Sequence, residues 1–287
     1  MSLRLGTQLL IVGSSPTAAV EILKTCDRTL SARYVPHAEP AKSPELNHLS
    51  LGWAVECNDA WKSLRTICRN ELFSARAIES RACLREGKVM EMVKFLSEME
   101  GEVVKVGEVD FATVFNTLSN VLMSKDFISL EKGSVDGGTE GLIRTYIEVL
   151  SAPNLADFYP IFAALDLQGL NKRSKELFRR IFSIWEPIIE ERRGLKRGDS
   201  SGQKDFLDAL INNAFTNDQI NHLLLGLFSA GTDTSTSTTE WTMAELMKNP
   251  ESMEKVRDEL TREIKQESPK ESHLPKLPYL QACVKKL

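Results

Sequence analysis

The run Ala230-Gly231-Thr232-Asp233-Thr234-Ser235 lies inside a long stretch of helical periodicity, and it decides how the rest of the chain is interpreted. Glycine costs about 1 kcal/mol relative to alanine in a helix interior, and threonine and serine offer the backbone competing hydrogen bonds. A strong helix that breaks its own local rules commonly does so for a functional site. The run therefore predicts a site on this helix.

The residues of the run suit a small ligand that takes up protons as it reacts. Gly231 leaves the helix surface bare, so a ligand can approach the backbone closely. A threonine hydroxyl bonded back to a carbonyl can open the helix locally, and Asp233 beside Thr234 can pass protons inward. We expect Thr232–Ser235 to be buried with hydrogen-bond partners. The alternative is an ordinary helix that turns amphipathic here, with its threonines and serines facing water.

The run belongs to the longest helix that the sequence predicts. Thr216 and Gln219 fit a capping box at its start, and the pattern continues to Pro250, which makes about 33 residues or about 50 Å. Leu223–Phe228 is apolar on all sides of the helix, which predicts that this part is buried.

The remainder of the chain predicts a mainly α fold with a small β component, an α+β class. Leu3–Val12 and Val103–Val106 have strand character, Gly133–Gly138 reads as a loop and Gly194–Gln203 as a polar linker. No repeat or clean boundary is visible, so we expect one domain over residues 1–287. Further predicted helices begin at Ser15-Pro16 and at Pro278. The other predicted helices are Asp59–Phe73, Ala75–Met99, Val109–Leu122, Leu142–Leu150, Leu170–Arg193, Phe206–Ile211 and Glu251–Gln266.

Composition excludes several classes of function. The net charge of −4 gives no reason to expect a nucleic-acid partner. No stretch of about 18 apolar residues occurs, so we expect no membrane anchor in this chain. The cysteines are odd in number and form no C-x-x-C pair, which predicts free thiols and no structural zinc site. Cys68 and Cys83 fall among apolar helical positions and are expected in the core.

The long helix resembles the central helix of cytochrome P-450 haem-thiolate monooxygenases. That family carries Ala/Gly-Gly-x-Asp/Glu-Thr-Thr/Ser, which Ala230–Ser235 matches at every position. Trp61-Lys62-Ser63-Leu64-Arg65 matches the family's Trp-x-x-x-Arg on an early helix, although such a pair alone is more often surface packing. Leu277–Lys285 resembles the approach to the family's Glu-x-x-Arg helix. The resemblance covers essentially the whole chain.

The resemblance implies a haem b cofactor and roles for the run on the long helix. Asp233 and Thr234 would be the acid–alcohol pair that delivers protons for the cleavage of dioxygen. Ala230 and Gly231 would form the oxygen groove over the haem.

The resemblance also implies partners and a location. Trp61 and Arg65 would contact a haem propionate, a task that suits the guanidinium fork. Electrons would come from an NADPH–cytochrome P-450 reductase, and the substrate would be a small apolar organic molecule. The implied location is the cytosolic face of the endoplasmic reticulum membrane.

A finer resemblance is to plant enzymes of the group that contains N-methylcoclaurine 3'-hydroxylase, in benzylisoquinoline alkaloid synthesis. It rests on Arg28–Arg33, Ser50–Ala54 and Leu165–Gly169. Plant monoterpenoid hydroxylases are the nearest alternative, and hydroxylation and phenol coupling both stay open. The loop Pro36–Val55 and the long helix would then line a substrate pocket; the alternative is that these residues are plain core and connector. The implied pocket residues are Trp53, Ala54, Leu224, Leu227 and Phe228.

Several features of the family do not occur in these 287 residues. The loop Phe-x-x-Gly-x-Arg-x-Cys-x-Gly, which supplies the axial cysteine, is absent, so no metal ligand is assigned in this chain. The Glu-x-x-Arg motif would begin at Lys286, and the N-terminal anchor helix is missing. We therefore expect a partial fold, truncated at both ends, that lacks the C-terminal haem-ligand region and is inactive alone. The alternative to a fragment of an enzyme is a non-catalytic truncated product.

Overall fold

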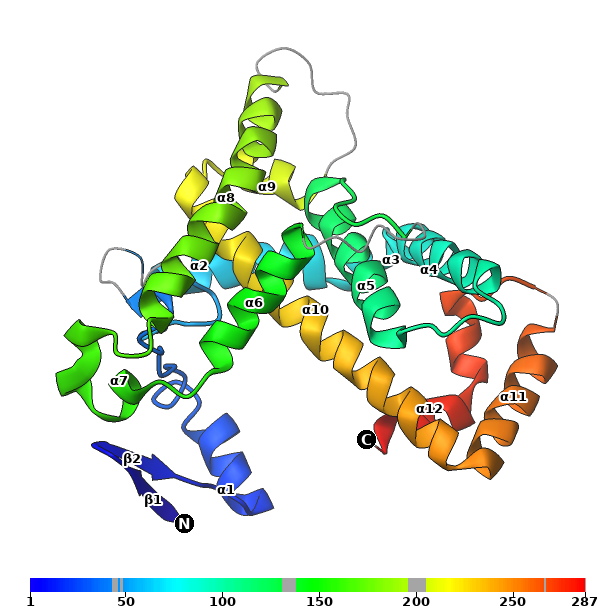
Figure 1. Cartoon of the computed structure of the whole chain (residues 1–287), viewed down its shortest axis with the longest axis horizontal. Helices are drawn as coiled ribbons and strands as arrows, with labels where there is room; N and C mark the ends of the chain where they lie inside the picture. The colour runs from blue at the N-terminus through cyan, green and yellow to red at the C-terminus, as the bar shows by residue number, and fades with distance from the viewer. Residues whose placement is uncertain (43–45, 47–48, 131–137, 196–204, 266, 287) are drawn as a thin grey trace. The chain divides into compact units, whose positions relative to one another are not determined.

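The structure, a computed structural model, describes residues 1–42, 46, 49–130, 138–195, 205–265 and 267–286, most of them helical (Figure 1). The strands are β1 (Ser2–Leu5) and β2 (Gln8–Ile11). The α-helices are α1 (Pro16–Val20), α2 (Asp59–Cys68), α3 (Ala75–Glu79), α4 (Ala82–Glu98), α5 (Val106–Met123), α6 (Thr139–Ser151), α7 (Leu155–Phe158), α8 (Leu170–Leu195), α9 (Phe206–Asn212), α10 (Asn217–Lys248), α11 (Pro250–Ile264) and α12 (Pro278–Lys285). The π and 3₁₀ turns are η1 (Glu21–Thr25), η2 (Pro40–Lys42), η3 (Arg69–Phe73), η4 (Pro160–Leu165) and η5 (Glu271–Lys276).

The mainly α class with a small β component is confirmed, but the β component differs from the expectation. β1 and β2 form an antiparallel hairpin in which Leu3 pairs with Leu10. The expected continuous strand over Leu3–Val12 is wrong, because Gly6 adopts a φ of +62° and turns the chain back on itself.

The second expected strand, Val103–Val106, is also wrong. Val106 instead begins α5, and Val103 ahead of it is 96% exposed, without the half-buried setting that a strand needs. The helical region predicted over Asp59–Met99 is confirmed in place, but it is interrupted at η3 and again before α4. The other predicted helices are confirmed to within a few residues. The predicted loop at 133–138 and linker at 194–203 fall largely outside the described residues.

α10 begins where the sequence predicts. Thr216 Oγ1 accepts from the Gln219 backbone N–H at 3.2 Å, and Gln219 Oε1 accepts from the Thr216 N–H at 2.9 Å, which is a reciprocal capping box. The helix continues for 32 residues. Its first half is buried as predicted, with Leu223 at 1% and Phe228 at 0% exposure.

Contacts group the chain into two compact units, and α10 contributes to both. The first consists of Met1–Leu72, Gly141–Gln203 and Leu207–Gly226. The second consists of Phe73–Glu140, Lys204–Phe206 and Leu227–Leu287. No helix in the described part of the chain is long and apolar enough to cross a bilayer.

Each unit has its own apolar centre. In the first, α8 turns one face inward, with Leu177, Ile181, Trp185 and Ile189 spaced four residues apart and at most 6% exposed. In the second, the Phe115 ring of α5 stacks 4.8 Å from the Phe228 ring of α10. Aromatic pairs of this kind add about 0.5–1.5 kcal/mol beyond the area that they bury.

Candidate functional site

Most hydroxyl groups on the polar half of α10 donate hydrogen bonds to backbone carbonyls of the same helix. Thr234 Oγ1 donates to the Ala230 carbonyl at 2.8 Å, and Ser235 Oγ donates to the Gly231 carbonyl at 3.0 Å. The helix stays α-helical throughout its length, so the local opening that such bonds can produce is not observed in α10. The same bond to the carbonyl four residues earlier is made by Thr232, Thr236, Thr238, Thr239 and Thr242.

The expectation that the whole threonine and serine run is buried is wrong. Thr232 and Thr236 are 0% and 5% exposed, whereas Asp233, Thr234 and Ser235 are exposed. Residues four apart share one helix face, so 232 and 236 lie inward while 233–235 turn outward. The acid and the alcohol of the family motif therefore stand side by side on the open face of α10.

The glycine of the motif is approached closely, by a side chain of α5. The position that a Cβ on Gly231 would take lies 3.0 Å from Leu118 Cδ2. Gly226, earlier on the same helix, has nothing within 4 Å of that position. Gly231 thus serves packing on one side, while Ala230 beside it is exposed. The oxygen-groove role of Ala230 and Gly231 stays a prediction.

Trp61 and Arg65 lie together on α2, which Asn58 caps through a hydrogen bond to the Trp61 backbone N–H. The Arg65 guanidinium stands 5.3 Å from the centre of the Trp61 ring, within cation–π range. The indole N–H donates to the Leu51 carbonyl at 3.0 Å, so this donor is already used. Arg65 is exposed, and no carboxylate pairs with it in the described part of the chain.

The five residues expected to line a substrate pocket have different surroundings. Leu224 and Phe228 are 0% exposed and Ala54 is 3% exposed, as in a packed core. Trp53 and Leu227 are half-buried. The packing of Leu224 and Phe228 agrees with the alternative of plain core, and a role in binding substrate stays a prediction for all five.

The start of the expected substrate loop is fixed by a carboxylate that sequence reasoning missed. Asp157 Oδ1 accepts from Tyr34 Oη at 2.9 Å and from the His37 backbone N–H at 2.8 Å. Burial and the neighbouring carboxylate raise the pKa of Tyr34 to about 12, so its phenol stays a donor at neutral pH. His37 and Asp157 are 120 residues apart, and no local sequence pattern predicts a contact at that separation.

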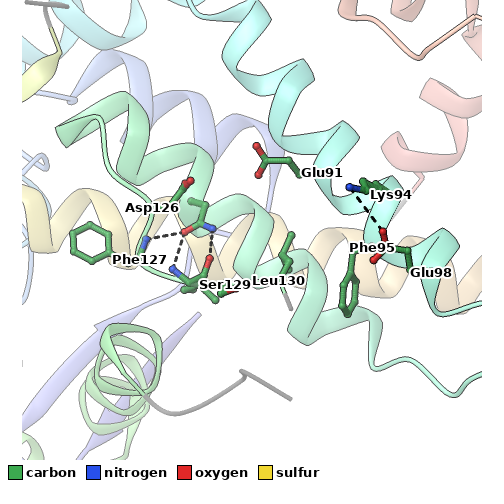
Figure 2. A pocket seen from close by; sticks show the side chains of 10 residues that line it. Glu91, Lys94, Phe95, Glu98, Asp126, Phe127, Ser129 and Leu130 are labelled. Carbon is green, nitrogen blue, oxygen red and sulfur yellow. Dashed lines mark hydrogen bonds and ion pairs between the residues drawn. The ribbon is translucent and has the colours of Figure 1, made fainter. Parts of the chain in front are cut away.

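A hollow of about 600 Å³ opens in the second unit beside α4 (Figure 2). Each of its carboxylates has a lysine partner: Lys88 lies 3.0 Å from Glu91 and 2.7 Å from Asp126, and Lys94 lies 3.9 Å from Glu98. These ion pairs leave little charge to attract a cation. The lining includes Glu91, Phe95, Glu98, Asp126 and Phe127.

All five cysteines are free thiols. Cys68 is 1% exposed, which confirms its place in the core, and burial raises the pKa of its thiol to about 12. The same expectation is wrong for Cys83, which is exposed in the first turn of α4. Among the described residues, no group of three or more His, Cys, Asp or Glu side chains could hold a metal ion.

Comparison with known proteins points to one family. The family model for cytochrome P-450 matches residues 1–286. The chain is 44% identical to corytuberine synthase and 45% identical to the probable (S)-N-methylcoclaurine 3'-hydroxylase isozyme 2, both of Coptis japonica, over 99% of this chain and 57% of each relative. It is 42% identical to (S)-N-methylcoclaurine 3'-hydroxylase isozyme 1 of Papaver somniferum, over 99% of this chain and 59% of that relative. The chain thus spans less than two thirds of the length of these relatives.

Proposed function

The chain belongs to the cytochrome P-450 family, and on that premise we propose that the whole protein is a haem-dependent monooxygenase that hydroxylates, or oxidatively couples, a benzylisoquinoline alkaloid. The names of the similar proteins, a 3'-hydroxylase of N-methylcoclaurine and a corytuberine synthase, support this substrate class. The described residues are mainly helical with one small hairpin, a partial form of the family's fold.

The observation that carries the proposal is the exposed Asp233–Thr234 pair on α10. The Thr234 hydroxyl gives its own hydrogen to the Ala230 carbonyl at 2.8 Å, so its oxygen can still accept a hydrogen bond from water or from a protonated Asp233. An acid and an alcohol side by side on an open helix face can pass a proton from solvent to a reacting oxygen. This is the work that the family motif implies for these two residues.

The α2 residues fit a haem propionate through Arg65. When bound, the haem would supply the iron that activates dioxygen, with electrons from an NADPH–cytochrome P-450 reductase. Arg65 would hold a propionate in a charge-assisted hydrogen bond, and Trp61 would keep the guanidinium in place by stacking. Cys68 is not assigned as the thiolate ligand, because it lies on α2 with its side chain 1% exposed in the core.

The proposed location of the whole protein is the cytosolic face of the endoplasmic reticulum membrane. Apolar side chains on the hairpin and on η4 support it: Leu9, Ile11 and Ile161 are 69%, 65% and 82% exposed. The Thr7 backbone N–H in the hairpin turn donates to the Phe158 carbonyl at 2.9 Å, which holds the turn against the end of α7, just before η4. Contiguous exposed apolar surface is typical of contact sites for membranes or other proteins.

The test is to express the native transcript that carries these residues, together with a plant NADPH–cytochrome P-450 reductase. Microsomes would receive NADPH and either N-methylcoclaurine or a monoterpenoid alcohol. We expect NADPH-dependent oxidation of the alkaloid and a thiolate-type ferrous–CO spectrum. Oxidation of the monoterpenoid alone would overturn the substrate class and keep the monooxygenase. A product with neither spectrum nor turnover would favour the non-catalytic alternative.

A further inference from the structure

Glu259 is a buried acid on α11 to which the proposed monooxygenase gives no role. It is 4% exposed and lies one turn after Val256, which is 4% exposed as well. Arg262, one turn further along the helix, forms an ion pair with Glu263 at 2.9 Å. Burial of a carboxylate is costly unless hydrogen bonds compensate it, so the partners of Glu259 show what it does.

The partners of Glu259 are two backbone N–H groups of α12, 20 and 21 residues further along the chain. Oε1 accepts from the Tyr279 N–H at 2.9 Å, and Oε2 accepts from the Leu280 N–H at 2.9 Å. Helices α11 and α12 are in contact within the second unit (Figure 1). Hydrogen bonds to a carboxylate are stronger than those between neutral groups, and the first turn of a helix favours negative charge. Both oxygens of this carboxylate therefore stabilise the start of a single helix.

Helix α12 has no cap of its own. Leu277, at the N-cap position, is 3% exposed and offers no side-chain hydrogen bond to the first turn. Pro278 follows without an N–H, and the Gln281 N–H already bonds to the Leu277 carbonyl at 3.1 Å. Tyr279 and Leu280 hold the donors that the helix leaves open, and the α11 carboxylate takes both. Since α12 has only eight residues, far fewer than the about 12–15 of a marginally stable isolated helix, it depends on such contacts.

Helix α12 forms part of the wall of a hollow of about 680 Å³ beside α10, distinct from the hollow beside α4. Cys283 and Val284 line it from α12, and Thr238 and Trp241 line it from α10. Thr238 lies one turn after Thr234 on the same face of α10. The position of α12 thus decides what stands beside the part of α10 that follows the acid–alcohol pair.

We propose that Glu259 is a positioning residue that caps α12 from α11 and so holds the α12 wall of this hollow in place beside α10. Glu259 acts only through α12. Its value for catalysis rests on the proposed function, whereas the cap belongs to the folded chain with or without haem. The two can therefore be tested apart.

The first test compares amide hydrogen exchange in the whole 287-residue chain with that in Glu259→Gln, followed by NMR. Glutamine keeps the length and one acceptor, but it sets an NH₂ group against the second backbone N–H. We expect exchange at Tyr279 and Leu280 to become at least about tenfold faster, as the loss of one hydrogen bond to a charged group implies. The matched control is Glu254→Gln, at an exposed position of the same helix, which should leave both rates unchanged.

A second readout separates displacement of α12 from loss of the fold. Cys283 lines the hollow and is half-buried, whereas Cys68 is 1% exposed in the first unit. In Glu259→Gln we expect iodoacetamide to label Cys283 faster than in the wild type by a factor similar to that of the exchange, with Cys68 still unlabelled. A merely general loss of stability would expose both thiols. Unchanged labelling of Cys283 together with unchanged exchange in α12 would overturn the proposal.

The wild type alone supplies a third measurement, which does not require the variant to fold. Helix α4 begins after Arg81 without a side-chain cap, so Cys83 and Leu84 in its first turn serve as the uncapped reference. We expect Tyr279 and Leu280 to exchange at least about tenfold more slowly than these two. Equal rates would overturn the proposal. Absence of monooxygenase activity from the native transcript's product would leave the exchange and labelling results untouched.

Discussion

At the scale of the residue, Thr232 and Thr234 each donate a hydrogen bond to the backbone carbonyl four residues earlier, but they differ in exposure. Substitution of the two residues therefore tests effects on stability and effects on chemistry separately. Thr232 is 0% exposed and Thr234 lies on the open face. We expect Thr234→Ala to change the free energy of unfolding by less than about 0.5 kcal/mol, because alanine is a better helix former at an exposed position. Thr232→Ala should cost about 1–3 kcal/mol, since it opens a cavity and removes a buried bond. Urea denaturation of the chain measures both.

The same substitution has a different expected result in the whole enzyme. Thr234→Ala should uncouple NADPH consumption from product formation, because the hydroxyl that accepts the proton from the acid side is lost. The ratio of product to NADPH consumed measures this. A ratio equal to that of the wild type would remove Thr234 from the proton path, even if stability behaves as expected.

Two cysteines give a direct check on burial. The Cys68 thiol is 1% exposed with a pKa raised to about 12 by burial, and Cys83 is exposed. Alkylation needs an accessible thiolate, so we expect iodoacetamide to label Cys83 in the folded chain and Cys68 only in denaturant. Peptide mass spectrometry reads out both sites. Equal labelling of the two in the folded chain would mean that α2 opens readily.

The residues of the motif were predictable from sequence, but their exposure was not. Ala230–Ser235 stands out because it breaks helix propensity, and that signal is local. Threonine is tolerated on either face once its hydroxyl bonds to the carbonyl four residues back, as Thr232 and Thr234 both do. Which face is buried depends on what packs against α10, and sequence periodicity says little where every position is small and polar.

At the scale of the helix, the two glycines of α10 form a matched pair. Gly226 has open space where a Cβ would stand, and Gly231 meets Leu118 at 3.0 Å. We expect Gly226→Ala to stabilise the chain by about 0.5–1 kcal/mol through helix propensity. Gly231→Ala should bring no gain, because Leu118 must shift to make room. Urea denaturation compares the two variants.

A double variant tests whether the contact with Leu118 is what prevents a gain from Gly231→Ala. In a Leu118→Ala background the obstacle is gone, so Gly231→Ala should recover the gain that Gly226→Ala shows. A gain from Gly231→Ala in the unaltered chain would mean that the Leu118 side chain moves aside at little cost in free energy.

Helices were well predicted because their signals lie within a few residues. The Thr216–Gln219 capping box, which opens α10, is one example. The strands were not well predicted, because a hairpin depends on the conformation of one turn. Gly6, at a φ of +62°, divides an apparent strand of ten residues into two short ones. Contacts between distant segments, such as Asp157 with His37, carry no sequence signal at all.

At the scale of the whole chain, the family could be recognised from sequence because its motifs recur in order along 287 residues. The arrangement into units could not. Each unit is assembled from three separate stretches of chain, so no shift in composition marks a boundary. Contacts between residues far apart in the sequence create the units, and local sequence patterns do not predict such contacts.

We propose that the 287 residues nonetheless unfold as one domain, because the continuous helix α10 supplies residues to both cores. Ile181 is 0% exposed in the first unit and Phe115 is 0% exposed in the second. Ile181→Ala should cost about 2–5 kcal/mol and Phe115→Ala about 3–5 kcal/mol. In one cooperative domain, either change lowers the midpoint of the same single transition. Phe73→Ala, at a residue 59% exposed, should shift it little. Two calorimetric transitions, each lowered by only one of the core variants, would show instead that α10 melts between the units and that they fold separately.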